Sequence, residues 1–149
     1  MTPRQIELVQ SSFNLLIPIL ESVTMVFYDR LFQLDPSLRR MFRTPQPKQA
    51  RKLANVLTAV VKGLGHPEEI LSAVEELGRR HSNYGVQPEH YATVGEALMW
   101  TLQTGLGDVF TAEVGDAWAS AYSLLSLTMQ RAAVDVASVT CTAAALNVE

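Results

Sequence analysis

Apolar residues recur at helical spacing along the whole chain, and one of these stripes ends in a histidine. Val74, Leu77 and His81 stand at positions i, i+3 and i+7, so one helix face carries an imidazole beside apolar neighbours. No segment shows the alternation of polar and apolar residues that is typical of a half-buried strand. The pattern therefore predicts an all-α chain. A buried His81 ring needs a bonding partner, because an unpaired buried polar group costs ~1–3 kcal/mol. The pattern does not say what that partner is.

Capping residues and prolines divide the chain into helices. Thr2 and Gln5 form a capping box at the start of the first helix, and Pro18 places its end nearby. The segment 23–34 is apolar on nearly all sides, which predicts a buried helix and makes Tyr28 a buried phenol. We expect seven or eight helices of unequal length, which favours a globular α fold over an up-and-down bundle. The later elements are expected as a short helix over 38–42, a loop over 44–47, and helices that start near Lys48, Glu68, Pro88 and Thr111.

The last segment, residues 134–149, differs in composition from the rest. It is rich in β-branched residues, which are mediocre helix formers. Three interpretations remain open: the tail extends the last helix, pairs with another subunit, or frays. We therefore expect one domain over residues 1–133, followed by a helical extension or flexible tail, in a monomer or a homodimer.

Composition and charge exclude several classes of function. The formal net charge of −3 favours neither nucleic-acid binding nor attraction to acidic membranes. Cys141 is the only cysteine, which rules out an internal disulfide and a cysteine-based metal cluster and indicates a reducing compartment. The N-terminus lacks the layout of a signal peptide, and no apolar run approaches the ~18 residues of a membrane span. We expect a soluble, cytoplasmic protein.

Of the three histidines, only His81 lies on an apolar stripe. His66 falls in a Gly/Pro turn and His90 in the first turn of a helix, so both are interpreted as surface residues. One hypothesis makes His81 a core histidine bonded to the carbonyl of Leu77. A zinc site is disfavoured, because it needs three or four ligands and no second histidine has the right spacing. The other hypothesis is haem, whose iron needs a single protein ligand.

Four groups of residues then show a resemblance to a known family. Phe42 ends the run over 38–42, and Gly85 and Val86 follow His81. The remaining matches are the stretch 94–98 and the group Ala117, Trp118 and Tyr122. In this order and spacing, residues 4–133 resemble the globin family, above all bacterial single-domain globins, the globin domains of flavohaemoglobins, and neuroglobin. The resemblance implies a globin fold around haem b, with His81 as the proximal iron ligand and Phe42 stacked on the haem.

The resemblance also assigns residues to the open side of the haem. It puts Tyr28 above the iron, Gln49 where many globins have a distal histidine, and Leu53 one turn further on. A phenol O–H and an amide N–H can each donate a hydrogen bond to bound O2. Lys52 matches a position that often holds a cation beside a haem propionate, and Arg80 is a weaker candidate for the same role. The other implied haem contacts are Leu77, Val86, Tyr91 and Val94.

One position departs from the flavohaemoglobin pattern. In that group a tyrosine and a glutamate support the proximal histidine, and hydrogen bonds of this kind raise the basicity of an imidazole ligand. Tyr91 matches the tyrosine, whereas the glutamate position falls on Ala133. The departure disfavours peroxidase-like chemistry.

The function implied by the resemblance is reversible O2 binding, for transport or storage, at a five-coordinate ferrous haem. Five-coordination is expected because Gln49 is a poor iron ligand, with Tyr28 as a candidate ligand of the ferric form. The alternatives are NO dioxygenation, which detoxifies NO, and a haem-based gas sensor or a haem-free globin-like signalling module. Besides O2, the implied ligands of the haem include NO or CO. The 149 residues hold no flavin- or nicotinamide-binding domain, so enzymatic turnover is expected to need an external reductase.

Overall fold

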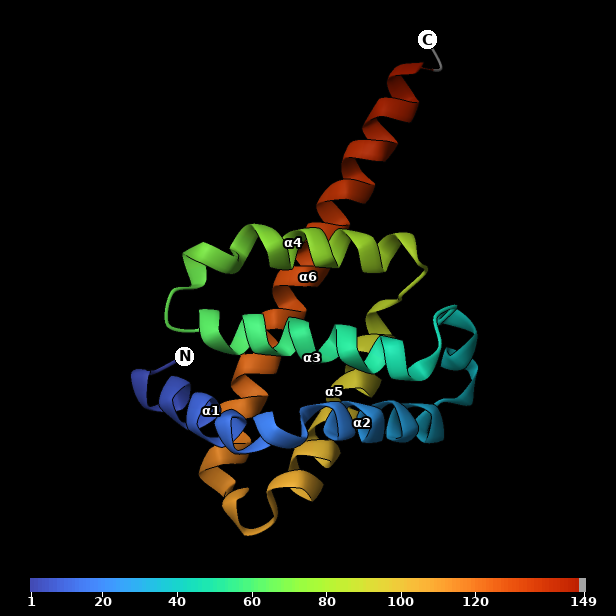
Figure 1. Cartoon of the computed structure of the whole chain (residues 1–149). Coiled ribbons are helices and arrows are strands. Elements are labelled where there is room, and N and C mark those ends of the chain that lie inside the picture. The colour runs from blue at the N-terminus through green and yellow to red at the C-terminus, as the bar shows by residue number, and fades with distance from the viewer. Residues whose placement is uncertain (148–149) are drawn as a thin grey trace.

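The chain is built from helices alone in the part that the structure describes. The computed structural model describes the backbone of residues 1–147 and the side chains of residues 1–134. It contains six α-helices, three short 3-10 helices and no strand within residues 1–147, which confirms the all-α prediction. The α-helices are fewer than the seven or eight expected, because the short segment expected as a helix over 38–42 forms a 3-10 helix. The elements are α1 (Pro3–Leu16), η1 (Ile17–Ile19), α2 (Leu20–Leu34), η2 (Pro36–Met41), α3 (Gln46–Gly63), α4 (Pro67–Asn83), α5 (Pro88–Leu106), η3 (Gly107–Val109) and α6 (Ala112–Asn147) (Figure 1).

Most helix boundaries follow the local signals in the sequence. The capping box at Thr2 is confirmed, because its Oγ1 accepts from the Gln5 N–H at 3.1 Å and its N–H donates to Gln5 Oε1 at 3.0 Å. Pro18 lies in η1, between α1 and α2. The expected loop over 44–47 is wrong in its second half, since α3 already begins at Gln46. Pro47 fits this first turn because a helix start needs no proline N–H.

Two other predictions need adjustment. The helix α2 is not buried on every side, because Asp29 and Gln33 are exposed, although Tyr28 is only 5% exposed. The helix α6 continues through Asn147, so the backbone of residues 134–147 extends the last helix. The domain boundary at residue 133 stays a prediction, and the side chain of Cys141 lies outside the described residues. Among the described residues, no helix has the length and apolar character needed to span a membrane.

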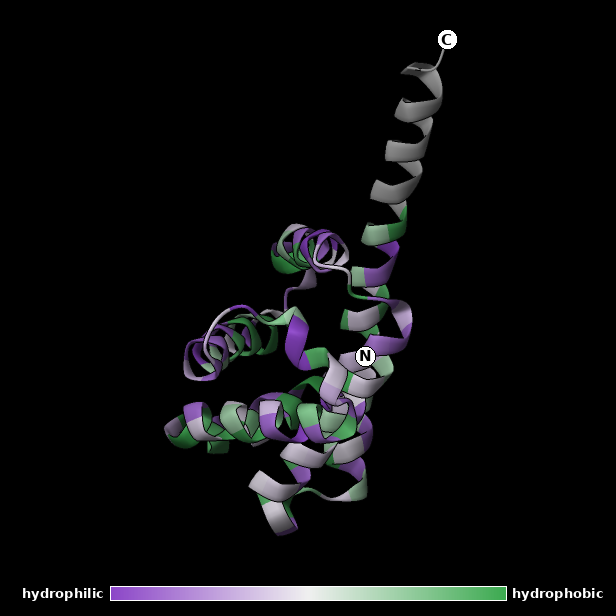
Figure 2. Cartoon of the chain, turned by 90° about the vertical axis from the view of Figure 1, so that its right-hand side faces the viewer, coloured by the Kyte–Doolittle hydropathy of each residue, from purple (hydrophilic) through white to green (hydrophobic). Residues whose placement is uncertain are grey.

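The apolar core consists of two clusters. The larger one joins α1, α2, α3, α5 and α6, and the smaller one is centred on Val74, Tyr91 and Met129 of α4, α5 and α6. The helix α4 packs mainly on α6, whereas α2 packs on α3 and α5 (Figure 1). Both α3 and α5 contribute side chains to each cluster, so these two helices connect the clusters. Figure 2 shows hydrophilic and hydrophobic residues mixed along the helices, as expected where each helix has one face in solvent.

A glycine lets α4 approach α6. A Cβ atom on Gly78 would lie 2.6 Å from the Cα of Met129 and closer still to the Met129 carbonyl oxygen. Backbone atoms cannot rotate away as a side chain can, so only glycine permits this approach. His81 follows on the same helix, less than one turn beyond Gly78. The contact at Gly78 therefore sets the position of the histidine relative to α6.

Candidate functional site

Three aromatic rings bring α2 and the end of η2 together. The ring of Tyr28 packs edge-on against Phe42, with 5.4 Å between the ring centroids. Phe32 lies 5.5 Å from Phe42 and 6.0 Å from Tyr28, again between centroids. Perpendicular or tilted arrangements of this kind are favourable for aromatic pairs. The structure therefore brings together two of the predicted site residues, Tyr28 and Phe42.

Gln49 belongs to the same corner of the molecule. It is half-buried on α3, and its side chain lies close enough to the Tyr28 hydroxyl to affect it. Burial raises the pKa of the Tyr28 phenol, and the hydrogen-bonding contact with Gln49 acts in the opposite direction. Because burial is the larger influence, the phenol keeps its proton at neutral pH and remains a hydrogen-bond donor.

His81 presents a ring with one nitrogen engaged. Its Nδ1 lies 2.7 Å from the carbonyl oxygen of Leu77, one turn earlier on α4. A carbonyl oxygen only accepts, so Nδ1 carries the proton and Nε2 keeps a lone pair. Burial lowers the pKa of His81, and the hydrogen bond to Leu77 partly opposes that effect. Within the described residues Nε2 has no hydrogen-bond partner, so the neutral ring has a free ligand atom.

The bond to Leu77 is the one that the core-histidine hypothesis predicted. It satisfies only Nδ1, however, and it is also the bond that fixes a metal-binding histidine in the tautomer with Nε2 free. The two hypotheses therefore share this contact, and other residues of the site have to separate them.

Half-buried apolar side chains belong to both clusters. Phe42, Leu53 and Val94 pack against the larger cluster, whereas Leu77 and Val86 pack against the smaller one. None of these five side chains is fully buried or exposed. Large apolar residues inside a helical domain usually reach full burial, so this set indicates surfaces suited to an apolar partner.

These residues fit a haem. The free Nε2 of His81 is the single ligand atom that haem iron takes from a protein, and a neutral imidazole is a common choice. The five half-buried apolar side chains suit the faces of a flat apolar ring. Tyr28, which lies close to Gln49, keeps its proton and offers a hydrogen-bond donor.

The expected support for His81 from Tyr91 stays a prediction. Tyr91 is buried in the smaller cluster, and burial raises the pKa of its phenol. Its backbone carbonyl accepts a hydrogen bond from the Tyr122 hydroxyl at 2.5 Å. Among the described hydrogen bonds, that of the His81 ring runs to Leu77, and none joins the ring to Tyr91. Ala133 is half-buried and brings no carboxylate.

The two candidates for a propionate contact differ in their neighbours. Lys52 is exposed on α3 and has no ion pair among the described residues. Arg80 is exposed on α4, and its Nε lies 3.5 Å from Glu76 Oε1. Lys52 is therefore the better placed to receive an anion, and both roles stay predictions.

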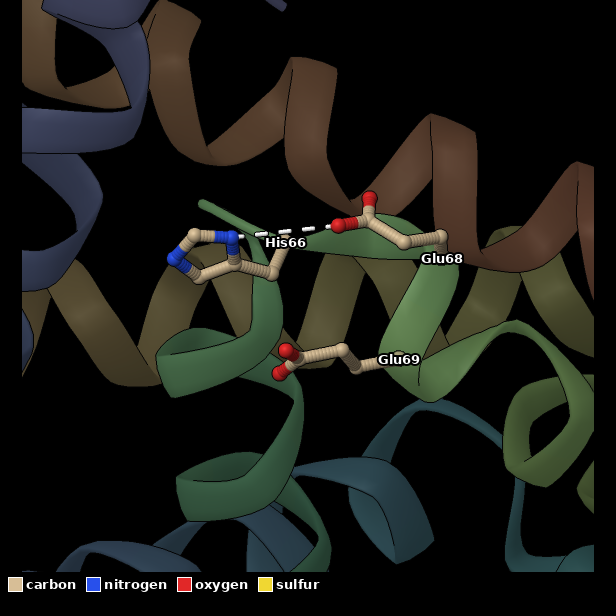
Figure 3. A group of neighbouring side chains, drawn as sticks. All are labelled: His66, Glu68 and Glu69. Atoms are coloured by element: carbon tan, nitrogen blue, oxygen red, sulfur yellow. Dashed lines mark ion pairs between the residues drawn. The ribbon is translucent and has the colours of Figure 1, made fainter.

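The other two histidines lie apart from this group. His66 is exposed, as expected, and its Nδ1 lies 3.8 Å from Glu68 Oε1, with Glu69 nearby (Figure 3). All three side chains are exposed, which is ordinary for surface ionic residues and is no built metal site. His90 is half-buried, not a plain surface residue, because its Nδ1 accepts from the Gln87 N–H at 2.9 Å and caps α5.

The sequence interpretation missed two residues that position the site. Gln46 donates from Nε2 to Asp29 Oδ1 at 2.7 Å, which ties the start of α3 to α2 and brings Gln49 toward Tyr28. Nothing in the local pattern indicates that pair, because its partners are 17 residues apart. Gly78 was detectable, since a glycine inside a strong helical stripe suggests a close packing contact.

Comparisons with known proteins show which family the chain resembles. The globin family model matches residues 26–129, which is more than half of the chain. A flavohemoprotein of Bacillus subtilis is 33% identical over 126 residues, covering 83% of this chain and 32% of that protein. A flavohemoprotein of Vibrio cholerae is 34% identical over 133 residues, covering 85% of this chain and 33% of that protein. The chain thus spans about one third of the length of these relatives.

Solved structures show the same fold. An engineered carbene transferase, made from a candidate nitric oxide dioxygenase of Rhodothermus marinus, has a TM-score of 0.86 and 26% identity and covers 95% of this chain and 99% of its own. A bacterial globin of Campylobacter jejuni has a TM-score of 0.82 and 24% identity, with coverage of 92% and 99%. The second likeness supports the fold alone. With the family model matched over residues 26–129, the chain belongs to the globin family.

Proposed function

We propose that this globin holds haem b through His81 and binds O2 reversibly beside Tyr28 and Gln49. The observation that carries the proposal is the His81 ring, whose Nδ1 is held by Leu77 while Nε2 is free. Haem b is favoured over a covalently attached haem, because thioether attachment uses a pair of cysteines and the sequence has one.

The chain's own residues have distinct roles in this proposal. The Leu77 carbonyl fixes the tautomer of His81, and burial keeps the ring neutral and therefore able to act as a ligand. Phe42, Leu53 and Val94 supply apolar contact and exclude water. The Tyr28 hydroxyl donates a hydrogen bond on the distal side, with the Gln49 amide as the second donor. At ~0.5–1.5 kcal/mol for each bond, two donors raise O2 affinity by roughly 5- to 150-fold.

When bound, haem would supply ferrous iron for O2 binding.

NO dioxygenation is our second candidate. In this reaction the haem iron would supply the one electron needed to combine O2 and NO to nitrate. This candidate is favoured by the similarity to flavohemoproteins and to the candidate dioxygenase of Rhodothermus marinus. Repeated turnover needs a reductant, which we propose is a separate reductase.

Oxygen binding is tested on the purified holoprotein. We expect the ferrous protein to give a stable oxygenated spectrum in air that reverts fully when O2 is removed. Oxidation to the ferric form within seconds, with no reversible phase, would contradict O2 binding as the function.

NO dioxygenation requires a test of turnover. We expect one nitrate per NO in a single exposure and sustained NO consumption when a reductase and NADH are added. Consumption that stops after one equivalent, despite a ferric form that the reductase reduces, would contradict the enzymatic candidate and leave O2 binding in place. Rapid oxidation by NO alone does not discriminate, because it is the common reaction of oxygenated globins.

A further inference from the structure

Positive charge is concentrated in one part of this chain. Residues 36–67 contain seven of the 12 lysines and arginines and none of the 15 aspartates and glutamates. Outside this segment acidic residues outnumber basic ones by ten. The net charge of −3 is therefore the sum of a basic segment and an acidic remainder of the chain.

Six of the seven basic residues are close together in the fold. They lie on η2, on the loop after it and on the first two turns of α3, which occupy one end of the molecule (Figure 1). All six side chains are exposed. We call them the basic rim, and its members are Arg39, Arg40, Arg43, Lys48, Arg51 and Lys52.

The basic rim is not neutralised by neighbouring carboxylates. Among the described residues the ion pairs involve Arg4, Arg79, Arg80 and His66, and none involves a member of the rim. The two nearest acidic residues in the sequence are engaged elsewhere. Asp29 accepts from Gln46 Nε2 at 2.7 Å, and Asp35 accepts from the Ser37 N–H at 3.1 Å. Arg39 lies with its guanidinium 4.6 Å from the centroid of the Phe32 ring, so its contact is not with an anion.

The basic rim borders the candidate site. Phe42 lies between Arg40 and Arg43 in the chain, and Gln49 lies between Lys48 and Arg51. Both site residues therefore belong to the elements that carry the rim. A partner protein that docks on the rim is brought to the edge of the site.

We propose that the basic rim is the docking surface for the acidic face of a one-electron donor protein that carries a flavin or an iron–sulfur cluster. This inference rests on the proposed function, because a ferric haem has to be reduced before it binds O2 again. In the step the donor loses one electron and the ferric iron gains it, with no transfer of atoms. The acidic remainder of the chain favours a compact acidic protein over an extended polyanion, since a long anionic polymer reaches beyond the rim to repelling carboxylates.

The test uses the ferric holoprotein and reduced flavodoxin, an acidic flavin protein, as the probe. The rim variant is R40E/K48E, which spares Lys52 and the stacked Arg39. The control is K62E/R131E, which makes the same charge change at two exposed positions outside the rim. We measure the second-order rate constant of reduction at several ionic strengths, and the affinity of oxidised flavodoxin for the ferric protein by calorimetry.

We expect the rim variant to lower the rate constant roughly 10-fold or more at low ionic strength, and the control by less than about 2-fold. The affinity for flavodoxin should fall in parallel, and high salt should remove the difference between the variants. Equal effects of the two variants, or a rate independent of salt, would overturn the inference. The inference would also be overturned if RNA or anionic phospholipid vesicles bound the wild type more tightly than flavodoxin does and lost that binding in the rim variant.

Failure of the proposed function gives a different result. A protein without bound haem fails before the flavodoxin step. A holoprotein that binds O2 normally, but whose reduction does not depend on the rim, contradicts the docking surface alone.

Discussion

His81 uses its two ring nitrogens differently, and this division supports the assignment of the site. Nδ1 bonds the Leu77 carbonyl at 2.7 Å, which a core histidine and an iron ligand would both do. The stripe of Val74, Leu77 and His81 was sufficient to predict the placement of the ring. It could not distinguish the two roles, because the distinction depends on Tyr28, Phe42 and Gln49, which lie on other elements.

Removing the Tyr28 hydroxyl should weaken O2 binding. In Tyr28→Phe the ring and its packing on Phe42 remain, while one donor is lost. A single bond of ~0.5–1.5 kcal/mol corresponds to roughly a 2- to 13-fold faster O2 dissociation. Stopped-flow displacement of O2 by CO measures this rate. The matched control is Tyr84→Phe, which removes an exposed hydroxyl and should leave the rate unchanged.

The Tyr28 and Gln49 donors should be coupled. Because Gln49 lies against the phenol, the effects of Tyr28→Phe and Gln49→Leu on O2 dissociation should not add. A double-mutant cycle on the same rate measures the coupling. Strictly additive effects would mean that the two side chains act independently.

Buried tyrosines should make the protein sensitive to alkali. Burial, together with the neighbouring Tyr91, raises the pKa of Tyr122, and burial raises those of Tyr28 and Tyr91 as well. An unfolded tyrosine titrates near pH ~10, so below that pH the stabilisation is complete. Above it the unfolded chain releases protons that the folded chain retains, and the free energy of unfolding falls with rising pH.

Urea unfolding of the holoprotein between about pH 8 and 11 tests this expectation. In Tyr122→Phe the slope above pH ~10 should be smaller, by at most ~1.4 kcal/mol per pH unit. An unchanged slope would show that Tyr122 titrates in the folded state as it does in water.

At the level of elements, the contact of α4 with α6 positions the histidine. Gly78 meets the backbone of Met129, and no other residue type fits there without moving a helix. In Gly78→Ala the overpacking should cost ~1–3 kcal/mol, despite the better helix propensity of alanine. Gly65→Ala is the matched control, because its Cβ meets nothing within 4 Å.

Thermal unfolding and the rate of haem loss to an excess of apomyoglobin measure both effects. We expect Gly78→Ala to lower the Tm by several degrees and to release haem faster, with little change in Gly65→Ala. Equal behaviour of the two variants would contradict the role given to the α4–α6 contact.

The boundaries of most elements could be predicted because their signals are local. Thr2, Pro18 and Pro88 fix helix ends through capping or through a missing N–H, and the structure has them there. The start of α3 was misplaced because Pro47 fits within a first turn as readily as before one. Pairings between elements, such as Gln46 with Asp29, depend on the tertiary arrangement, so no periodic pattern in the sequence indicates them.

At the scale of the molecule, the two apolar clusters should differ in stability without haem. The smaller cluster has three fully buried members, and α4 has its main contacts with α6 alone. We expect haem to join the two clusters through His81 and the half-buried side chains of both clusters. Binding to the folded state also adds stability by mass action.

Hydrogen exchange of the haem-free and haem-bound protein tests this difference. Amides of α4 should exchange at least ~10-fold faster without haem, whereas those in α2 and α5 should change less. A uniform change across all helices would contradict a separate, weaker cluster.

The absorption spectrum of the ferrous protein, with and without the His81 side chain, tests whether His81 binds the haem iron. We expect one haem per chain and a five-coordinate ferrous spectrum in the wild type. This spectrum should be lost in His81→Gly and restored when imidazole is added, which separates a lost ligand from a misfolded chain. A wild-type protein that takes up no haem, or a His81→Gly variant with an unchanged spectrum, would contradict the role of His81 as the iron ligand.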